Sequence, residues 1–159
     1  MKLRIFLLIM IPCLILMSCG STTKIETTQS QAEKEKISKI YIVQKVIDDY
    51  EKNLGKYLHE KLLAAGVENQ VYFQSPLDLI DNEQIIKNTR DYNADHLLTI
   101  YLSSGYSYFL HYKVEITNVW SNELIWSGNI DTELGFSNKA SAAKAIDKLI
   151  EQLKKDNII

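Results

Sequence analysis

A long alternating run of apolar and polar side chains, residues 106–119, most constrains the fold of this sequence. Successive side chains of a strand point to opposite faces, so this run predicts one long strand with a packed face and a mostly wet face. Such one-sided burial is typical of an antiparallel sheet. The Ser121-Asn122 turn then predicts a hairpin with a strand over 124–130. The packed face is expected to carry Tyr106, Tyr108, Leu110, Tyr112, Val114 and Ile116.

The rest of the chain alternates between strand-like and helix-like patterns. Nearly every side chain of 37–43 is apolar, which predicts a strand covered on both faces. We expect a third, largely buried strand over 97–102, which Gly105 breaks. The order of elements predicts an α+β fold, with a mixed, mainly antiparallel sheet of about five strands and two to three helices on one face. The other expected elements are a helix over 48–65 ending at Gly66, a strand over 71–74, a short helix opened by Asp81 and Gln84, and a last helix from Ser137 to Lys155.

The first nineteen residues carry the order of features found in a secretory signal. Lys2 and Arg4 precede an unbroken apolar stretch over 5–17, and small residues follow it. A membrane-spanning helix needs about 20 apolar residues, and this stretch is shorter and contains Pro12. The pattern therefore favours a cleaved signal over a permanent transmembrane anchor.

The segment Leu16-Met17-Ser18-Cys19 resembles the lipobox of bacterial lipoproteins. That resemblance implies cleavage before Cys19, a diacylglyceryl group on its sulfur and acylation of the new amino terminus. Stable attachment to a bilayer takes about two lipid chains, so the lipid on Cys19 would suffice. Gly20 stands where enterobacterial lipoproteins kept in the inner membrane tend to have aspartate. The resemblance thus implies attachment to the periplasmic face of an outer membrane.

The chain is predicted to have three parts: a signal peptide over 1–18, a lipidated cysteine with a flexible tether over 19–36, and a single α+β domain over 37–159. Ile25 is the one large apolar side chain after Cys19 in the tether, which cannot offset the entropy of ordering. The other cysteine of the chain, Cys13, lies in the signal. The domain has no disulfide and must be stabilised by its own core.

The net charge of the chain does not favour binding to nucleic acid or to anionic lipid. The chain has a net charge of −2, and removal of Lys2 and Arg4 with the signal makes it more acidic. A nucleic-acid-binding surface is normally basic, so we expect no nucleic-acid partner. Membrane attachment is therefore predicted to depend on the N-terminal lipid anchor and not on a basic patch.

Two short segments resemble a group of bacterial envelope domains. Asn93-Ala94-Asp95 precedes an apolar strand, and Ile125-Trp126-Ser127 follows a turn. This pattern is similar to domains related to the curli secretion lipoprotein CsgG, the penicillin-binding-protein activator LpoB and the TolB amino-terminal domain. Those domains have glycine where Asn93 stands. The resemblance implies a non-catalytic module that docks and assembles with other envelope proteins.

No pattern of catalytic or metal-binding residues is apparent in the sequence. The histidines, His59, His96 and His111, lie on different expected elements, without the spacing of a metal motif. Asp48 and Asp49 sit where a helix begins and where carboxylates favour the helix dipole. We therefore expect no enzyme, no cofactor and no metal.

Three aromatic residues near the ends of the expected strands are the remaining candidates for a binding surface. Tyr106 and Tyr108 lie near the Gly105 turn, and Trp120 lies at the expected hairpin tip. Aromatic rings are enriched in protein interfaces, but tyrosines also pack beneath helices with their hydroxyls at a sheet margin. We predict a lipid-anchored protein-interaction or assembly module that docks through these residues onto an envelope protein. The alternative is a periplasmic binding module for a small molecule, glycan or lipid.

Overall fold

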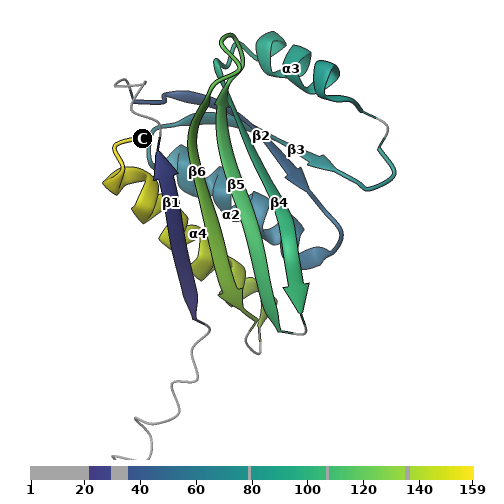
Figure 1. The fold of residues 1–159 in the computed structure, drawn as a ribbon, viewed down its shortest axis with the longest axis vertical. Helices are drawn as coiled ribbons and strands as arrows, with labels where there is room; N and C mark the ends of the chain where they lie inside the picture. The colour runs from purple at the N-terminus through teal and green to yellow at the C-terminus, as the bar shows by residue number, and fades with distance from the viewer. Residues whose placement is uncertain (1–21, 30–35, 79, 107, 135–136) are drawn as a thin grey trace, which may run out of the picture.

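The computed structural model describes residues 22–29, 36–78, 80–106, 108–134 and 137–159 (Figure 1). The expected signal peptide, Cys19 and part of the expected tether lie outside the described residues. The elements in chain order are β1 (Thr23–Gln29), β2 (Lys39–Lys45), α2 (Asp49–Ala64), β3 (Glu68–Gln74), α3 (Asn82–Asp91), β4 (His96–Tyr106), β5 (Phe109–Asn118), β6 (Leu124–Glu133) and α4 (Asn138–Lys155).

The strands form one six-stranded mixed sheet in the order β1-β6-β5-β4-β2-β3. β2 pairs parallel with both β3 and β4, whereas β4, β5, β6 and β1 pair antiparallel with their neighbours. The predicted α+β class and the mixed, mainly antiparallel sheet are confirmed. The sheet has one strand more than expected.

The additional strand is β1, which lies within the segment predicted to be a flexible tether. Thr23 to Gln29 pairs with β6 along its whole length, from Thr132 to Trp126. The tether prediction is therefore wrong for these residues. It relied on their low apolar content, but a β-branched edge strand can be held by the backbone groups that β6 presents. Its one large apolar side chain, Ile25, also packs against the core.

Two helices, α2 and α4, cover the same face of the sheet (Figure 1). The main core lies between them and the sheet, and it includes the fully buried Trp126. The Trp126 Nε1 donates to Asp156 Oδ2 at 2.8 Å, which joins β6 to the end of α4. Gly128 makes room for the indole, because a Cβ at this position would overlap the Trp126 ring. The alternation predicted for β5 is confirmed, since Tyr112, Val114 and Ile116 are buried in this core.

The third helix, α3, packs against the opposite face of the sheet, which we call the open face because α2 and α4 leave it uncovered. Ile85 of α3 joins Tyr41, Val43 and Ala94 in a second buried cluster. The prediction that β2 is covered on both faces is confirmed, since Ile40 and Ile42 lie in the main core. The helices are thus divided between the two faces because β2 is apolar on both.

The β4–β5 hairpin turns later than expected. Gly105 was expected to end a strand, but it lies within β4, opposite Leu110 of β5. The turn falls between Tyr106 and Phe109, which are paired. The single strand predicted over 106–119 is therefore wrong at its beginning, because glycine in an extended conformation does not by itself interrupt a ladder. Tyr108 lies in the turn rather than on the packed face of a strand.

The predicted helix starts are confirmed. The carboxylate of Asp81 and the hydroxyl of Ser137 accept from the backbone N–H groups of Gln84 and Ala140. Asp48 caps α2 and accepts from the Glu51 N–H. These local bonds satisfy N–H groups that the first helical turn leaves without partners.

Glu51 completes the cap of α2 from a buried position. Its carboxylate accepts from the backbone N–H groups of Ile47 and of Asp48, the latter at 3.3 Å. Only 2% of Glu51 is exposed. Burial raises the pKa of Glu51 above the ordinary 4.5, although the two backbone hydrogen bonds oppose the shift.

A Glu51→Gln substitution is expected to flatten the pH dependence of stability. The pKa of Glu51 is higher in the folded state than in the unfolded state. Its contribution to the free energy of unfolding is therefore fully present below the unfolded-state pKa and is lost as pH rises through the folded-state pKa. The parent should therefore lose more unfolding free energy than the variant between about pH 4.5 and pH 7. Denaturant titrations across this range measure the difference. Glu60→Gln, on an exposed position of the same helix, is the control, and parallel curves for parent and Glu51→Gln would contradict the prediction.

Candidate functional site

Three aromatic side chains gather where β4 ends and β5 begins. Tyr106, Tyr108 and Phe109 are 82%, 69% and 52% exposed, respectively, and we call them the aromatic hairpin. The Tyr108 carbonyl accepts from the Leu134 N–H at 2.7 Å, which ties the turn to the end of β6. The hairpin therefore presents three neighbouring rings to solvent from a position held by the sheet.

The described chain begins at the same end of the sheet. The backbone N–H of Glu133 donates to the Thr22 carbonyl at 3.0 Å, and Glu133 also pairs with Phe109 of β5. The Thr22 hydroxyl donates to the Glu133 carboxylate at 3.2 Å. Neighbouring strands lie about 4.8 Å apart, so Thr22 is within about 15 Å of Tyr106 across the strand ends. Figure 1 shows the start of β1 and the end of β4 at the same, lower edge.

Trp120 lies at the opposite end of the sheet, in the turn between β5 and β6. It is 64% exposed. Its Nε1 donates to Asp95 Oδ1 at 2.7 Å, and the Arg90 guanidinium lies over its ring at 4.4 Å. Arg90 also donates to the Val119 carbonyl at 2.7 Å. The Trp120 ring is thus held in place while one surface stays open to solvent.

The structure does not bring the predicted partner-binding residues together. Tyr106 and Tyr108 are separated from Trp120 by the length of β5, which has ten residues and therefore spans about 30 Å. Arg90, which the sequence interpretation missed, belongs to the Trp120 surface. No local signal marks this role, because the hydrogen bond joins residues 29 positions apart.

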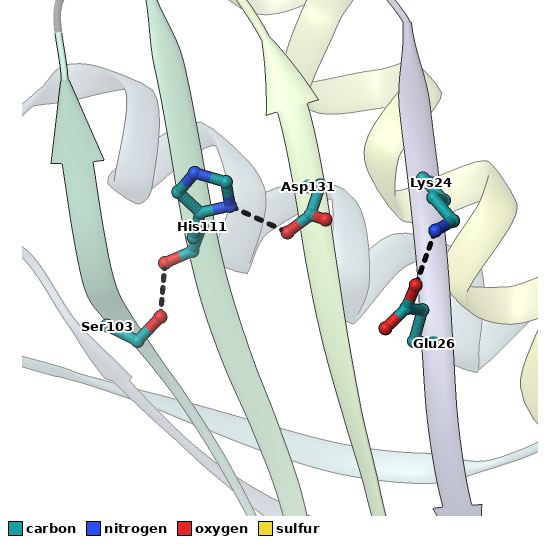
Figure 2. A network of polar contacts seen from close by, with 5 residues as sticks. All are labelled: Lys24, Glu26, Ser103, His111 and Asp131. Carbon is teal, nitrogen blue, oxygen red and sulfur yellow. Dashed lines mark hydrogen bonds and ion pairs between the residues drawn. The ribbon is translucent and has the colours of Figure 1, made fainter.

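The open face carries a polar network across β4, β5 and β6 (Figure 2). His111 Nδ1 lies 2.8 Å from Asp131 Oδ1. The Ser103 hydroxyl donates to the backbone carbonyl of His111 at 2.8 Å, and not to its ring. The nucleophile–base bond of a serine hydrolase is therefore not formed by these side chains. On β1, Lys24 forms an ion pair with Glu26.

The remaining titratable groups do not form a metal site in the part of the chain that the structure describes. His59 Nδ1 lies 2.7 Å from the side-chain oxygen of Asn69, far along the chain from His111. No group of three or more histidine, cysteine, aspartate or glutamate side chains is placed to hold a metal among the described residues. Within the same ranges, no helix is long and apolar enough to cross a membrane.

A cavity of about 430 Å³ lies between α3 and the open face, and we call it the α3 groove. Lys45, at the end of β2, is the one charged residue among those that line it. Thr99 and Thr117 contribute hydroxyl groups from β4 and β5. The apolar lining consists of Val43, Ile80, Ile85, Ile86, Leu97 and Val119.

A second cavity of about 300 Å³ adjoins the α3 groove and shares two lining residues with it, Lys45 and Gln74. The Gln74 Nε2 donates to the Ile80 carbonyl at 3.5 Å. Its Oε1 is buried and has no hydrogen-bond partner among the described residues. Lys45 and Gln74 therefore mark the junction of the two cavities.

Solved structures with the same architecture exist, although no family model and no curated protein match the chain. A PelC dodecamer from Paraburkholderia phytofirmans is similar with a TM-score of 0.61 and 15% identity, over 83% of this chain and 97% of that one. This chain has the PelC fold. A variant PelC dodecamer from the same organism gives a TM-score of 0.55 and 13% identity, over 82% and 95% of the two chains. At this identity the similarity to PelC concerns the fold alone.

Proposed function

We propose that this chain is a lipid-anchored cell-envelope lipoprotein that acts as a non-catalytic protein-interaction or assembly module. Cys19 would hold it on a bilayer, at the periplasmic face of an outer membrane. One observation carries the proposal: the described chain begins at the same end of the sheet as the aromatic hairpin. Cys19 precedes Thr22 by three positions, a reach of about 10 Å at most. The acyl chains and the aromatic hairpin would therefore meet the same surface.

The chemistry of the aromatic hairpin suits a membrane surface. Tyrosine is enriched where the hydrocarbon of a bilayer meets water, because its ring is apolar and its hydroxyl is polar. Tyr106 and Tyr108 supply two such rings, and Phe109 adds an apolar one. In this proposal the two tyrosines contact lipid, rather than the protein partner that the sequence suggested.

The Trp120 surface would then face away from the bilayer, toward the envelope partner. Tryptophan and arginine are enriched at the centres of protein interfaces. Because Asp95 and Arg90 already hold the Trp120 ring, a partner would lose little side-chain entropy on binding it. The PelC structures are dodecamers, so a second copy of this chain is the first partner to test.

A pair of tryptophan reporters tests the orientation. In the acylated parent protein on vesicles, Trp120 is the exposed indole and Trp126 the buried one. In a Tyr108→Trp/Trp120→Phe variant, the exposed indole moves to the aromatic hairpin. We expect lipids with brominated acyl chains to quench the emission of the variant severalfold more than that of the parent, because bromine quenches on close approach. Equal quenching, or stronger quenching of the parent, would contradict the orientation.

The α3 groove is a specific observation in favour of the alternative, a module that binds a small molecule. Ligand sites typically have volumes of about 300–1,000 Å³, and the volume of the groove, about 430 Å³, falls in this range. The two functions are compatible because the groove and the aromatic hairpin involve different halves of the sheet.

A further inference from the structure

We propose that the α3 groove binds an amphipathic anion, a small carboxylate with an apolar tail. Its charged group would lie at Lys45 and its tail between α3 and the open face. This inference does not rest on the lipid anchor, because the groove is formed by the folded domain alone.

The position of Lys45 provides the charge complementarity. It is the one charged residue that lines the α3 groove. Its Nζ lies 5.5 Å from the centre of the Tyr101 ring, and it has no carboxylate partner within ion-pair distance in the described chain. The nearby Glu115 is engaged by Lys113 at 2.7 Å. An anion in the groove would therefore meet an unneutralised ammonium group and no carboxylate.

The adjoining cavity has one carboxylate among its lining residues, Asp78, and this carboxylate is already hydrogen-bonded. Asp78 accepts from the Tyr72 hydroxyl at 2.8 Å and from the Ser75 N–H at 2.9 Å. These bonds hold Asp78 toward β3 and its own loop, and Asp78 does not line the α3 groove, where Lys45 is the one charged residue.

The walls of the groove suit an apolar tail. Ile85 and Ile86 of α3 face Leu97 and Val119, which lie near the start of β4 and just after the end of β5. Burial of apolar surface contributes about 25 cal/mol per Å², so a tail of several methylenes would add measurable affinity. The neutral hydroxyls of Thr99 and Thr117 carry no charge that would repel the anion.

The junction of the two cavities also has a hydrogen-bond acceptor without a donor in the described part of the chain, the side-chain oxygen of Gln74. The buried Oε1 of Gln74 lacks a donor among the described residues, and buried oxygens in proteins normally have one. A hydroxyl or amide N–H next to the carboxylate of the ligand could satisfy it. A hydroxy fatty acid or an N-acyl amino acid should therefore bind more tightly than an unsubstituted fatty acid of the same length.

Binding of octanoate to the acylated protein in phospholipid nanodiscs tests the inference. Equilibrium dialysis against empty nanodiscs should detect saturable octanoate binding, and no comparable binding of octylammonium or acetate. Hydrogen bonds to charged groups contribute about 1.5–3 kcal/mol, so Lys45→Met should weaken octanoate binding about tenfold or more. Thr99→Asp, which adds a negative charge to the groove, should abolish it.

The matched control is Lys24→Met, the same change on an exposed residue of the open face outside the groove. It should leave octanoate binding unchanged. Absence of saturable octanoate binding, equal binding of octylammonium, or full affinity in both the Lys45→Met and Thr99→Asp variants would overturn the inference. None of these outcomes bears on the lipid anchor, since the acylated protein is used throughout.

Discussion

Trp126→Ala is expected to lower the free energy of unfolding by about 3–5 kcal/mol, as large-to-small substitutions of buried aromatic residues do. Trp126 is fully buried in the main core and joins β6 to α4 through its hydrogen bond to Asp156. The position of Gly128 beneath the ring shows that the backbone is shaped around the indole. A cavity left there could not be refilled by small shifts, because interiors are packed to crystal-like density.

The control is the same substitution at the other tryptophan. Trp120 is largely exposed, so Trp120→Ala loses mainly its hydrogen bond to Asp95 and its contact with Arg90. A hydrogen bond contributes about 0.5–1.5 kcal/mol net, and the expected loss is correspondingly small. Chemical denaturation of both variants measures the difference. Similar losses for the two would contradict the assigned roles of the tryptophans.

Cys19→Ala is expected to abolish acylation of the chain and to release it from the membrane fraction. Each buried methylene contributes about 0.8 kcal/mol to membrane attachment, and alanine has no sulfur to carry the diacylglyceryl group. The aromatic hairpin alone would give weak, reversible association. Labelling with palmitate followed by membrane fractionation measures both effects.

Cys13→Ala is the matched control, because it removes the other cysteine of the chain from within the expected signal. It should incorporate palmitate as the parent does. Undiminished labelling of the Cys19→Ala variant would contradict the lipid anchor. Mass spectrometry that finds an intact, unacylated amino-terminal segment on the purified parent would do the same. Neither result would alter the binding expected at the α3 groove.

Features that depend on neighbouring residues could be predicted from the sequence. The caps at Asp48, Asp81 and Ser137 each use a side chain and a backbone group three positions later. The alternation over β5 likewise placed Tyr112, Val114 and Ile116 on the packed face. Such patterns follow from the geometry of one helix or one strand, so the chain carries them locally.

Features that depend on residues far apart in the chain could not be predicted from the sequence. The polar segment of β1 becomes a strand only because β6 lies beside it, and Thr23 meets Thr132 from 109 positions away. The distance between Tyr108 and Trp120, the contact of Arg90 with Trp120 and the α3 groove likewise depend on how segments far apart in the chain pack together.

The amino-acid order thus set the helices, most of the strands and the α+β class through local periodicity and capping. Tertiary structure decided which edge β1 joined, which face α3 covered and which exposed rings shared an end of the sheet. These arrangements follow from backbone pairing and side-chain packing between segments far apart in the chain, whose energies no single segment contains.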